Sequence, residues 1–279
     1  MRQLLIMLLA FLIFSSLFCT KVVEANGVDR AGNFTIAIDP GHQLHGNSEL
    51  EPIGPGATQK KAKVAPGTRG VATKVPEYQL TLDVSLKLRD ELIARGYRVF
   101  MTREINEVNI SNRERAAMAT EAGADIFIRV HADGSENRNA AGILTICPTS
   151  NNPYIPHLYP RSRALSDAIL SSMVAATGAH KRGVREVDNM SGMNWSTMPV
   201  TILEMGFMTN PAEDRLMQTK EYQQKLVMGI ADGVDLFFDH FPFTRHMEAI
   251  ADLGIAHAIQ RRHSARAGAC RLNALPLSV

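Results

Sequence analysis

The feature that most constrains the fold is a regular alternation of short apolar segments with longer helical stretches, which begins at Phe34. The short segments are bounded by Gly or Pro, as strands often are, and they cover residues 34–39, 97–103, 124–130, 142–147 and 199–205. The helical stretches cover residues 77–95, 111–122, 161–177 and 220–238. Strands that alternate with helices predict an α/β fold. We expect a single domain with a mainly parallel, twisted sheet flanked by helices, of the phosphorylase/hydrolase-like class.

The stretch 77–95 has two conflicting signals. Its apolar residues recur at every second position from Tyr78 to Leu88, which favours a strand. It is, however, rich in leucine rather than in β-branched residues, and Gly96 follows it in the position of a helix C-cap glycine. We therefore predict a helix that is apolar on both sides and more deeply buried than usual.

The first residues, 1–25, have the pattern of a secretory signal peptide: a positive start, an uncharged apolar run and a small-residue exit at Ala25. The alternative is a retained membrane anchor, because the apolar run is only slightly shorter than a bilayer span. If the segment is removed, Cys147 and Cys270 remain, and two cysteines do not make a disulfide framework. We expect an exported protein that is stabilised by its core, with no stable membrane partner once the signal peptide is cleaved.

Two segments do not follow the alternation. Residues 46–73 are rich in Gly, Pro, Lys and Thr and are predicted to form a long loop, which inside a domain is usually functional or disordered. Residues 241–279 form a basic C-terminal tail of unknown structure, which we expect to be peripheral. The formal net charge is +2, and no Lys/Arg stripe is interleaved with aromatic residues, so we expect no nucleic-acid partner.

Four side chains suited to metal chemistry stand at strand ends or at a helix start. His42, His131 and Glu204 come at the ends of predicted strands, and Glu77 opens the helix at 77–95. Ligands bind outside the carboxyl ends of parallel strands, so these residues are expected to converge. Catalytic zinc takes three protein ligands of the imidazole and carboxylate type and keeps one position open for water. We assign His42, Glu77 and His131 to zinc and Glu204 to general-base catalysis.

Each of these residues also has an ordinary structural interpretation. A histidine past a strand is commonly a surface loop residue, and a glutamate in the first turn of a helix interacts favourably with the helix dipole. Glu204 is harder to explain in this way, because it closes an apolar strand and needs a reason to be there. The spacing of the four residues alone leaves both interpretations open.

Several stretches resemble the zinc-dependent N-acetylmuramoyl-L-alanine amidases of the amidase 3 type. They include "IAIDPGHQLHG", "ISNRERAAMATEAGADIFIRVHADG" and "MPVTILEMGFMTNPAEDRLM", and they follow the order of the family. The resemblance implies Zn²⁺ as the cofactor, His42, Glu77 and His131 as its ligands, and Glu204 as the catalytic residue. It implies a zinc amidase catalytic domain at 34–240.

The sequence departs from the family pattern at two positions. Asp133 stands where asparagine is often found after the His-Ala pair, and Thr81 where asparagine is frequent in the first helix. Because neither residue is an expected ligand, we expect altered loop hydrogen bonding and retained activity. No separate wall-binding module is evident.

The resemblance implies a monomeric peptidoglycan hydrolase that cleaves the amide between N-acetylmuramic acid and the L-alanine of the stem peptide. Its expected location is the bacterial cell wall, the periplasm or the extracellular space. The alternatives are a zinc peptidase for another cell-wall peptide bond and a non-catalytic wall-binding protein of the same fold. Lysines and an arginine in the 46–73 segment either meet anionic wall polymers or form a solvated face.

Overall fold

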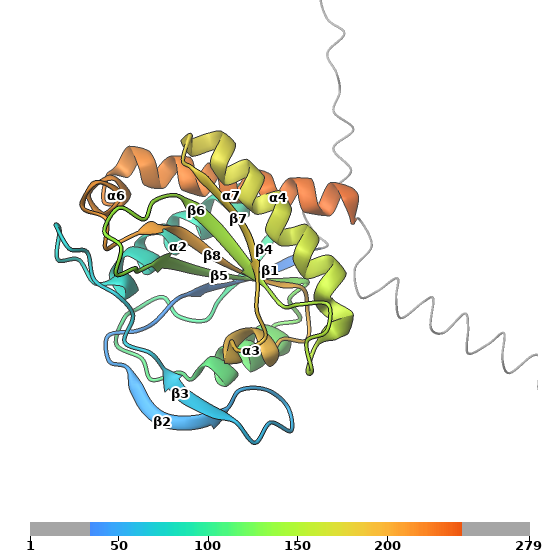
Figure 1. The fold of residues 1–279 in the computed structure, drawn as a ribbon. Coiled ribbons are helices and arrows are strands. Elements are labelled where there is room, and N and C mark those ends of the chain that lie inside the picture. Colours follow the sequence, from blue (N-terminus) through green and yellow to red (C-terminus); the bar gives the residue numbers. More distant parts are fainter. Residues whose placement is uncertain (1–33, 242–279) are drawn as a thin grey trace, which may run out of the picture.

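Six strands form a central sheet in the order β4-β1-β5-β8-β6-β7 in the computed structural model, which describes residues 34–241 (Figure 1). The strands are β1 (Thr35–Pro40), β4 (Arg98–Met101), β5 (Ile126–Asp133), β6 (Ile143–Cys147), β7 (Lys181–Glu186) and β8 (Val200–Phe207). The first four strands of this order are mutually parallel, whereas β6 runs antiparallel to β8 and parallel to β7. The predicted α/β class with a mainly parallel sheet is confirmed.

One face of the sheet is covered by the long helices α2 (Glu77–Ala94), α4 (Tyr159–Thr177) and α7 (Lys220–His240) (Figure 1). The stretch with conflicting signals is therefore the helix α2, as predicted. It buries Leu80, Val84, Leu88 and Leu92 against the sheet at a spacing of four residues. It also buries Leu82, off that stripe.

The other face carries a thinner layer made of α3 (Asn112–Glu121), the short α5 (Ser191–Asn194) and the hairpin of β2 (Asn47–Pro52) and β3 (Lys60–Val64). Helix α3 begins with the capping box that Ser111 and Glu114 predict. Two further short helices, α6 (Pro211–Met217) and the 3₁₀ helix η1 (Pro156–Leu158), complete the described elements.

The prediction of a long loop over 46–73 is wrong for much of this segment, because it contains the two-stranded antiparallel hairpin β2–β3. Its strands read NSELEP and KKAKV, and most of their side chains are exposed or half-buried. A strand of this kind is held by its backbone ladder and has no alternation of apolar and polar residues. The edge strand β7, which reads KRGVRE, escaped the sequence prediction for the same reason.

Parts of the predicted domain organisation lie outside the described residues. The predicted signal peptide over 1–25 is one such part, and so is the tail beyond Phe241. Between residues 34 and 241, no helix combines the length and the apolar character that crossing a bilayer requires.

Candidate active site

The structure brings His42, Glu77 and His131 together at the carboxyl ends of β1 and β5. His42 follows β1, Glu77 is the first residue of α2, and His131 lies within β5. Glu77 Oε1 is 3.0 Å from His42 Nε2 and 3.1 Å from His131 Nδ1, and the two histidine nitrogens are 3.1 Å apart. Three potential ligand atoms thus point at one place, although the residues are far apart in the sequence.

The chemistry of these three side chains fits zinc. Ligand atoms bound tetrahedrally to zinc at its usual bond lengths are about 3.3 Å from one another, close to the separations here. His42 Nδ1 is 2.8 Å from the carbonyl of Ala65, so this nitrogen is placed to donate, which leaves the Nε2 lone pair for a metal. Such a second hydrogen bond to a carbonyl is typical of histidines that bind metals.

His131 and Glu77 are also held in the protonation states in which they can bind a metal, a neutral imidazole and an ionised carboxylate. Burial lowers the pKa of His131 to about 4, which keeps its ring neutral. Burial alone would raise the pKa of Glu77, but hydrogen bonds and charge from His131 and His42 outweigh it and hold the pKa well below its usual range. The backbone N–H groups of Thr68 and Ala132 donate to the two oxygens of the Glu77 carboxylate and fix its orientation.

Two glycines allow the histidine rings to pack this closely. A Cβ atom on Gly41 would lie 2.3 Å from Cε1 of His131. A Cβ atom on Gly67 would lie 2.9 Å from the ring of His42 and 3.1 Å from Oε2 of Glu77, and Gly67 also has a φ of +80°. Residues with a side chain do not fit at either position without moving a ring.

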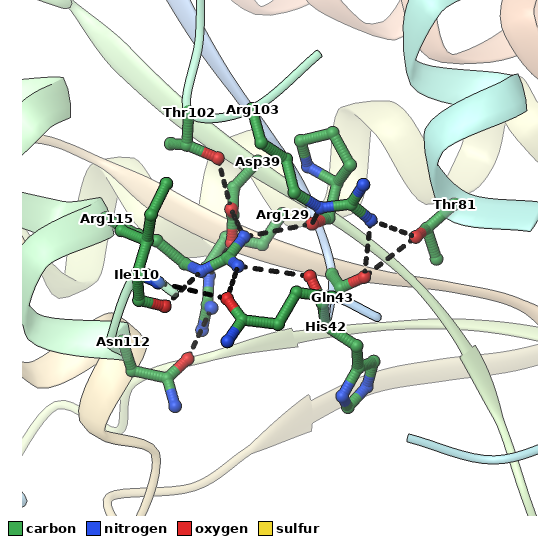
Figure 2. A network of polar contacts seen from close by, with 12 residues as sticks. Asp39, His42, Gln43, Thr81, Thr102, Arg103, Ile110, Asn112, Arg115 and Arg129 are labelled. Carbon is green, nitrogen blue, oxygen red and sulfur yellow. Dashed lines mark hydrogen bonds and ion pairs between the residues drawn. The ribbon is translucent and has the colours of Figure 1, made fainter. Parts of the chain in front are cut away.

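Asp39 fixes the turn that carries His42 from the interior of the domain (Figure 2). Asp39 is fully buried, and its carboxylate accepts hydrogen bonds from Thr102, Arg115 and Arg129. Burial would raise the pKa of this carboxyl, but the two guanidinium groups and the hydroxyl hold it well below its usual range. Asp39 therefore stays ionised and anchors two arginines under the site.

Arginines also hold the backbone of the turn itself (Figure 2). Arg103 donates to the carbonyls of Pro40 and Gly41, and Arg115 donates to those of Pro40 and His42. His42 adopts a φ of +63°, in the left-handed region that non-glycine residues seldom enter. The hydrogen bonds to its flanking carbonyls account for how this conformation is maintained.

Glu204 lies beside the three converging residues, within β8 and directly opposite His131 on β5. The expectation that His131 directly follows a strand is therefore wrong in detail, because β5 continues to Asp133. Glu204 lies within a strand as expected, although β8 continues beyond it to Phe207. Burial and the carboxylates of Glu77 and Asp133 raise the pKa of Glu204 well above its ordinary value. Among residues 34–241, Oε2 of Glu204 and Nε2 of His131 are buried without a hydrogen-bond partner.

All four predicted site residues line one cleft of about 420 Å³. The β2–β3 hairpin forms one wall, and it is joined to the segment around α5 by Lys61 Nζ, which donates to the carbonyl of Asn189. The indole N–H of Trp195 donates to the carbonyl of Pro52 at the end of β2. The predicted loop therefore does shape the cleft, as a hairpin.

Thr81 and Asp133, the two residues that depart from the family pattern, both make hydrogen bonds near the site. Thr81 Oγ1 donates to the carbonyl of Gly41, so the threonine supports the turn before His42. Asp133 accepts a hydrogen bond from the N–H of Gly134 at the mouth of the cleft. His45, only three residues after His42, is exposed and lines a different surface depression.

Sequence reasoning missed the supporting arginines Arg103, Arg115 and Arg129, all buried beneath the site. Arginines are usually exposed, so nothing in their own residue type marks them as buried. The one available signal is Arg129, which stands on the apolar strand that also carries His131.

Comparison with known proteins identifies the family of the chain. A family model described as N-acetylmuramoyl-L-alanine amidase matches residues 36–235. An N-acetylmuramoyl-L-alanine amidase of Mycobacterium tuberculosis, Rv3717, is 28% identical, with 71% of this chain and 84% of that protein covered. The amidase AmiC of Neisseria meningitidis is 25% identical over 73% of this chain, which spans about half (52%) of that protein.

A solved structure has the same fold. The crystal structure of the N-acetylmuramyl-L-alanine amidase Ami1 from Mycobacterium smegmatis aligns with a TM-score of 0.68 at 25% sequence identity. The alignment covers 75% of this chain and 99% of that one. With a family model that matches most of its length and the same fold in a solved relative, the chain belongs to the N-acetylmuramoyl-L-alanine amidase family, amidase 3 type.

Proposed function

We propose that the protein is a zinc-dependent peptidoglycan hydrolase that cleaves the amide between the lactyl group of N-acetylmuramic acid and L-alanine. The observation that carries this proposal is the convergence of His42, Glu77 and His131 next to Glu204 in one cleft. Membership of the amidase family supports the choice of bond. His42, Glu77 and His131 are proposed as the metal ligands and Glu204 as the catalytic residue.

The side chains of the cleft divide the chemistry between them. Zinc, when bound, lowers the pKa of a water molecule to about 7 and polarises the substrate carbonyl. Glu204 has a buried carboxylate oxygen without a partner and a raised pKa, so it is suited to take a proton from the attacking water. The same carboxyl group then delivers that proton to the leaving amine of L-alanine as the amide C–N bond breaks.

The domain organisation is part of the proposal. We assign residues 34–240 to the zinc amidase domain, in agreement with the matched range 36–235. The apolar N-terminal pattern over 1–25 supports export through a cleaved signal peptide. Action at the cell wall as a monomer is a further part of the proposal.

The decisive experiment combines metal analysis with mass spectrometry of peptidoglycan digested by the wild type and by Glu204→Gln. We expect about one zinc per chain and stem peptides with a free L-alanine amino end. Glu204→Gln should keep the zinc and lose about 100-fold or more of the activity. New amino ends at another residue would identify a zinc peptidase instead, and zinc-independent or absent cleavage would refute the proposal.

A matched pair of histidine variants tests the ligand assignment. His42→Ala should lose zinc and activity, because it removes one of three converging ligand atoms. His45→Ala removes an exposed histidine three residues away and should keep both. Equal zinc contents in the two variants would contradict the assignment of His42.

A further inference from the structure

A second groove, here called the β7 groove, opens beside the catalytic cleft. It encloses about 550 Å³ and is lined by β7, by the start of β6 and by the end of β8. Asp133 and Gly134 line both hollows, so the two adjoin at these residues. The β7 groove therefore lies next to the cleft that contains Glu204.

The strand register shows that this groove continues the face of the sheet that carries the site. Leu144 on β6 lies opposite Glu204 on one side and opposite Gly183 of β7 on the other. Residues directly opposite each other share a face of the sheet. Glu204, Leu144 and Gly183 thus form one row across β8, β6 and β7, with Gly183 at its end. Because Gly183 has no side chain, the groove is open at that end.

Two arginines of β7 point into this groove. Arg185 lies opposite Ile146, which itself lines the catalytic cleft. Arg182 is the extra residue of a β-bulge, because Ile143 pairs with Lys181 while Leu144 pairs with Gly183. A bulge re-aims the side chain of its extra residue, and the guanidinium of Arg182 lies 4.9 Å from the centre of the Phe207 ring at the groove wall.

The positively charged side chains on the two sides of the cleft differ in how many hydrogen-bond partners they already have within the protein. Lys61, on the hairpin side, already donates to the carbonyl of Asn189 at 2.6 Å. Arg182 donates once, to the carbonyl of Ala141. Arg185 is exposed, and no hydrogen bond or ion pair between side chains of residues 34–241 involves its guanidinium. Burial raises the pKa of Asp133 and of Glu204, and the charge of Arg185 acts on both carboxyl groups at longer range and partly offsets this rise. The carboxylate of Asp133 is the single opposing charge among the side chains that line the β7 groove.

We propose that the β7 groove binds the peptide part of the substrate through its carboxylates, with Arg185 and Arg182 as the recognising residues. This inference rests on the proposed amide hydrolysis. The carboxyl group of the muramoyl unit is consumed in the scissile amide, so the sugar side is uncharged, whereas a peptide ends in a carboxylate. The side of the cleft with available guanidinium groups is therefore the peptide side.

The test measures binding of a labelled peptide, which does not depend on bond cleavage. The peptide begins with L-alanine and carries two free carboxylates, and its counterpart has both converted to amides. Fluorescence anisotropy with the full-length protein should show about 10-fold tighter binding of the carboxylate form at low salt. Arg185→Gln should remove most of this preference, and Arg185→Glu should reverse it.

The same strand provides a matched control. The ammonium group of Lys181 donates to Ser171 of α4, on the opposite face of the sheet. Lys181→Gln therefore removes one charge from β7 without changing the groove, and it should keep the full preference. Equal binding of both peptides by the wild type, or equal losses for Lys181→Gln and Arg185→Gln, would overturn the inference.

Cleavage of peptidoglycan, assayed in parallel, separates this inference from the proposed function. Cleavage without a carboxylate preference in binding refutes the role of the β7 groove alone. A preference without any cleavage supports the groove as a site for acidic peptides and refutes the proposed hydrolysis.

Discussion

The two sides of the catalytic cleft are built in opposite ways. The turn from Pro40 to His42 is buried or half-buried, and each of its three backbone carbonyls accepts a hydrogen bond from Arg103, from Arg115 or from both. The β2–β3 hairpin is largely exposed and is joined to the rest of the domain at a few points, such as Lys61 and Trp195. The difference indicates that the position of the proposed metal ligands is fixed by the interior of the domain, whereas the outline of the cleft depends on a surface element.

The largest effect is expected from removing the anion that anchors the turn. Asp39→Ala leaves the guanidinium groups of Arg115 and Arg129 buried without their carboxylate. Breaking a buried ion pair by deleting one partner costs about 3–5 kcal/mol, and urea unfolding measures the loss. Asp90→Ala removes an exposed partner of Arg89 and should cost about 1 kcal/mol or less. Similar losses in both variants would contradict the contrast between interior and surface.

Acid should weaken the same anchor in the wild type. The pKa of Asp39 is lower in the folded protein than in the unfolded chain, so the unfolded chain binds more protons as the pH falls. The stabilisation is fully present above the unfolded pKa of about 4 and is lost progressively below it. The free energy of unfolding should therefore fall between pH 5 and pH 3, measured by urea titration at each pH.

Other carboxylates titrate in the same range, so the comparison is made with Asp39→Asn. This variant lacks the titrating group, and its free energy of unfolding should fall less over the same pH interval. Parallel decreases in the two proteins would show that Asp39 is not the group responsible.

A smaller effect is expected where the hairpin side meets the ligands. Gly67→Ala places a methyl group against the His42 ring and should lower zinc affinity about 10–100-fold, as changes next to metal ligands do. Gly56→Ala is the matched control, because Gly56 also has a positive φ but has no atom within 4 Å of its Cβ position. Competition with a chromophoric chelator should show unchanged zinc affinity for Gly56→Ala.

The smallest effect is expected where Trp195 holds the end of strand β2. Trp195→Phe removes the hydrogen bond from the indole to the carbonyl of Pro52 and should cost about 0.5–1.5 kcal/mol. Faster amide hydrogen exchange should be confined to β2 and β3, with zinc content unchanged. Faster exchange in β1 or β5 would show that the two sides of the cleft are coupled.

The sequence predicts those parts of the molecule in which the type of side chain indicates whether it is buried. The apolar strands of the sheet and the leucine-rich helix α2 are of this kind. So are the reactive side chains next to them, which are His42, His131 and Glu204 at the apolar strands and Glu77 at the start of α2. The structure brings His42, Glu77 and His131 together, while their roles and that of Glu204 remain predictions.

The rest of the fold depends on information that side-chain pattern does not contain. The hairpin and β7 are polar strands that are held by backbone pairing. The direction of β6 cannot be predicted from its sequence, because an apolar run has the same pattern in a parallel and in an antiparallel strand. The buried arginines depend on Asp39, a partner 76 residues away from Arg115 in the chain.

The antiparallel direction of β6 separates the proposed peptide groove from the proposed catalytic residues along the chain. Because β6 turns back, residues 134–142 arch past the end of β8, where Ser135 bonds to Thr209 and Ala140 to Asn210. This arch borders the β7 groove and contributes none of the four proposed catalytic and metal-binding residues. A change in the length of the arch should therefore alter the proposed peptide groove and leave the four proposed catalytic and metal-binding residues in place.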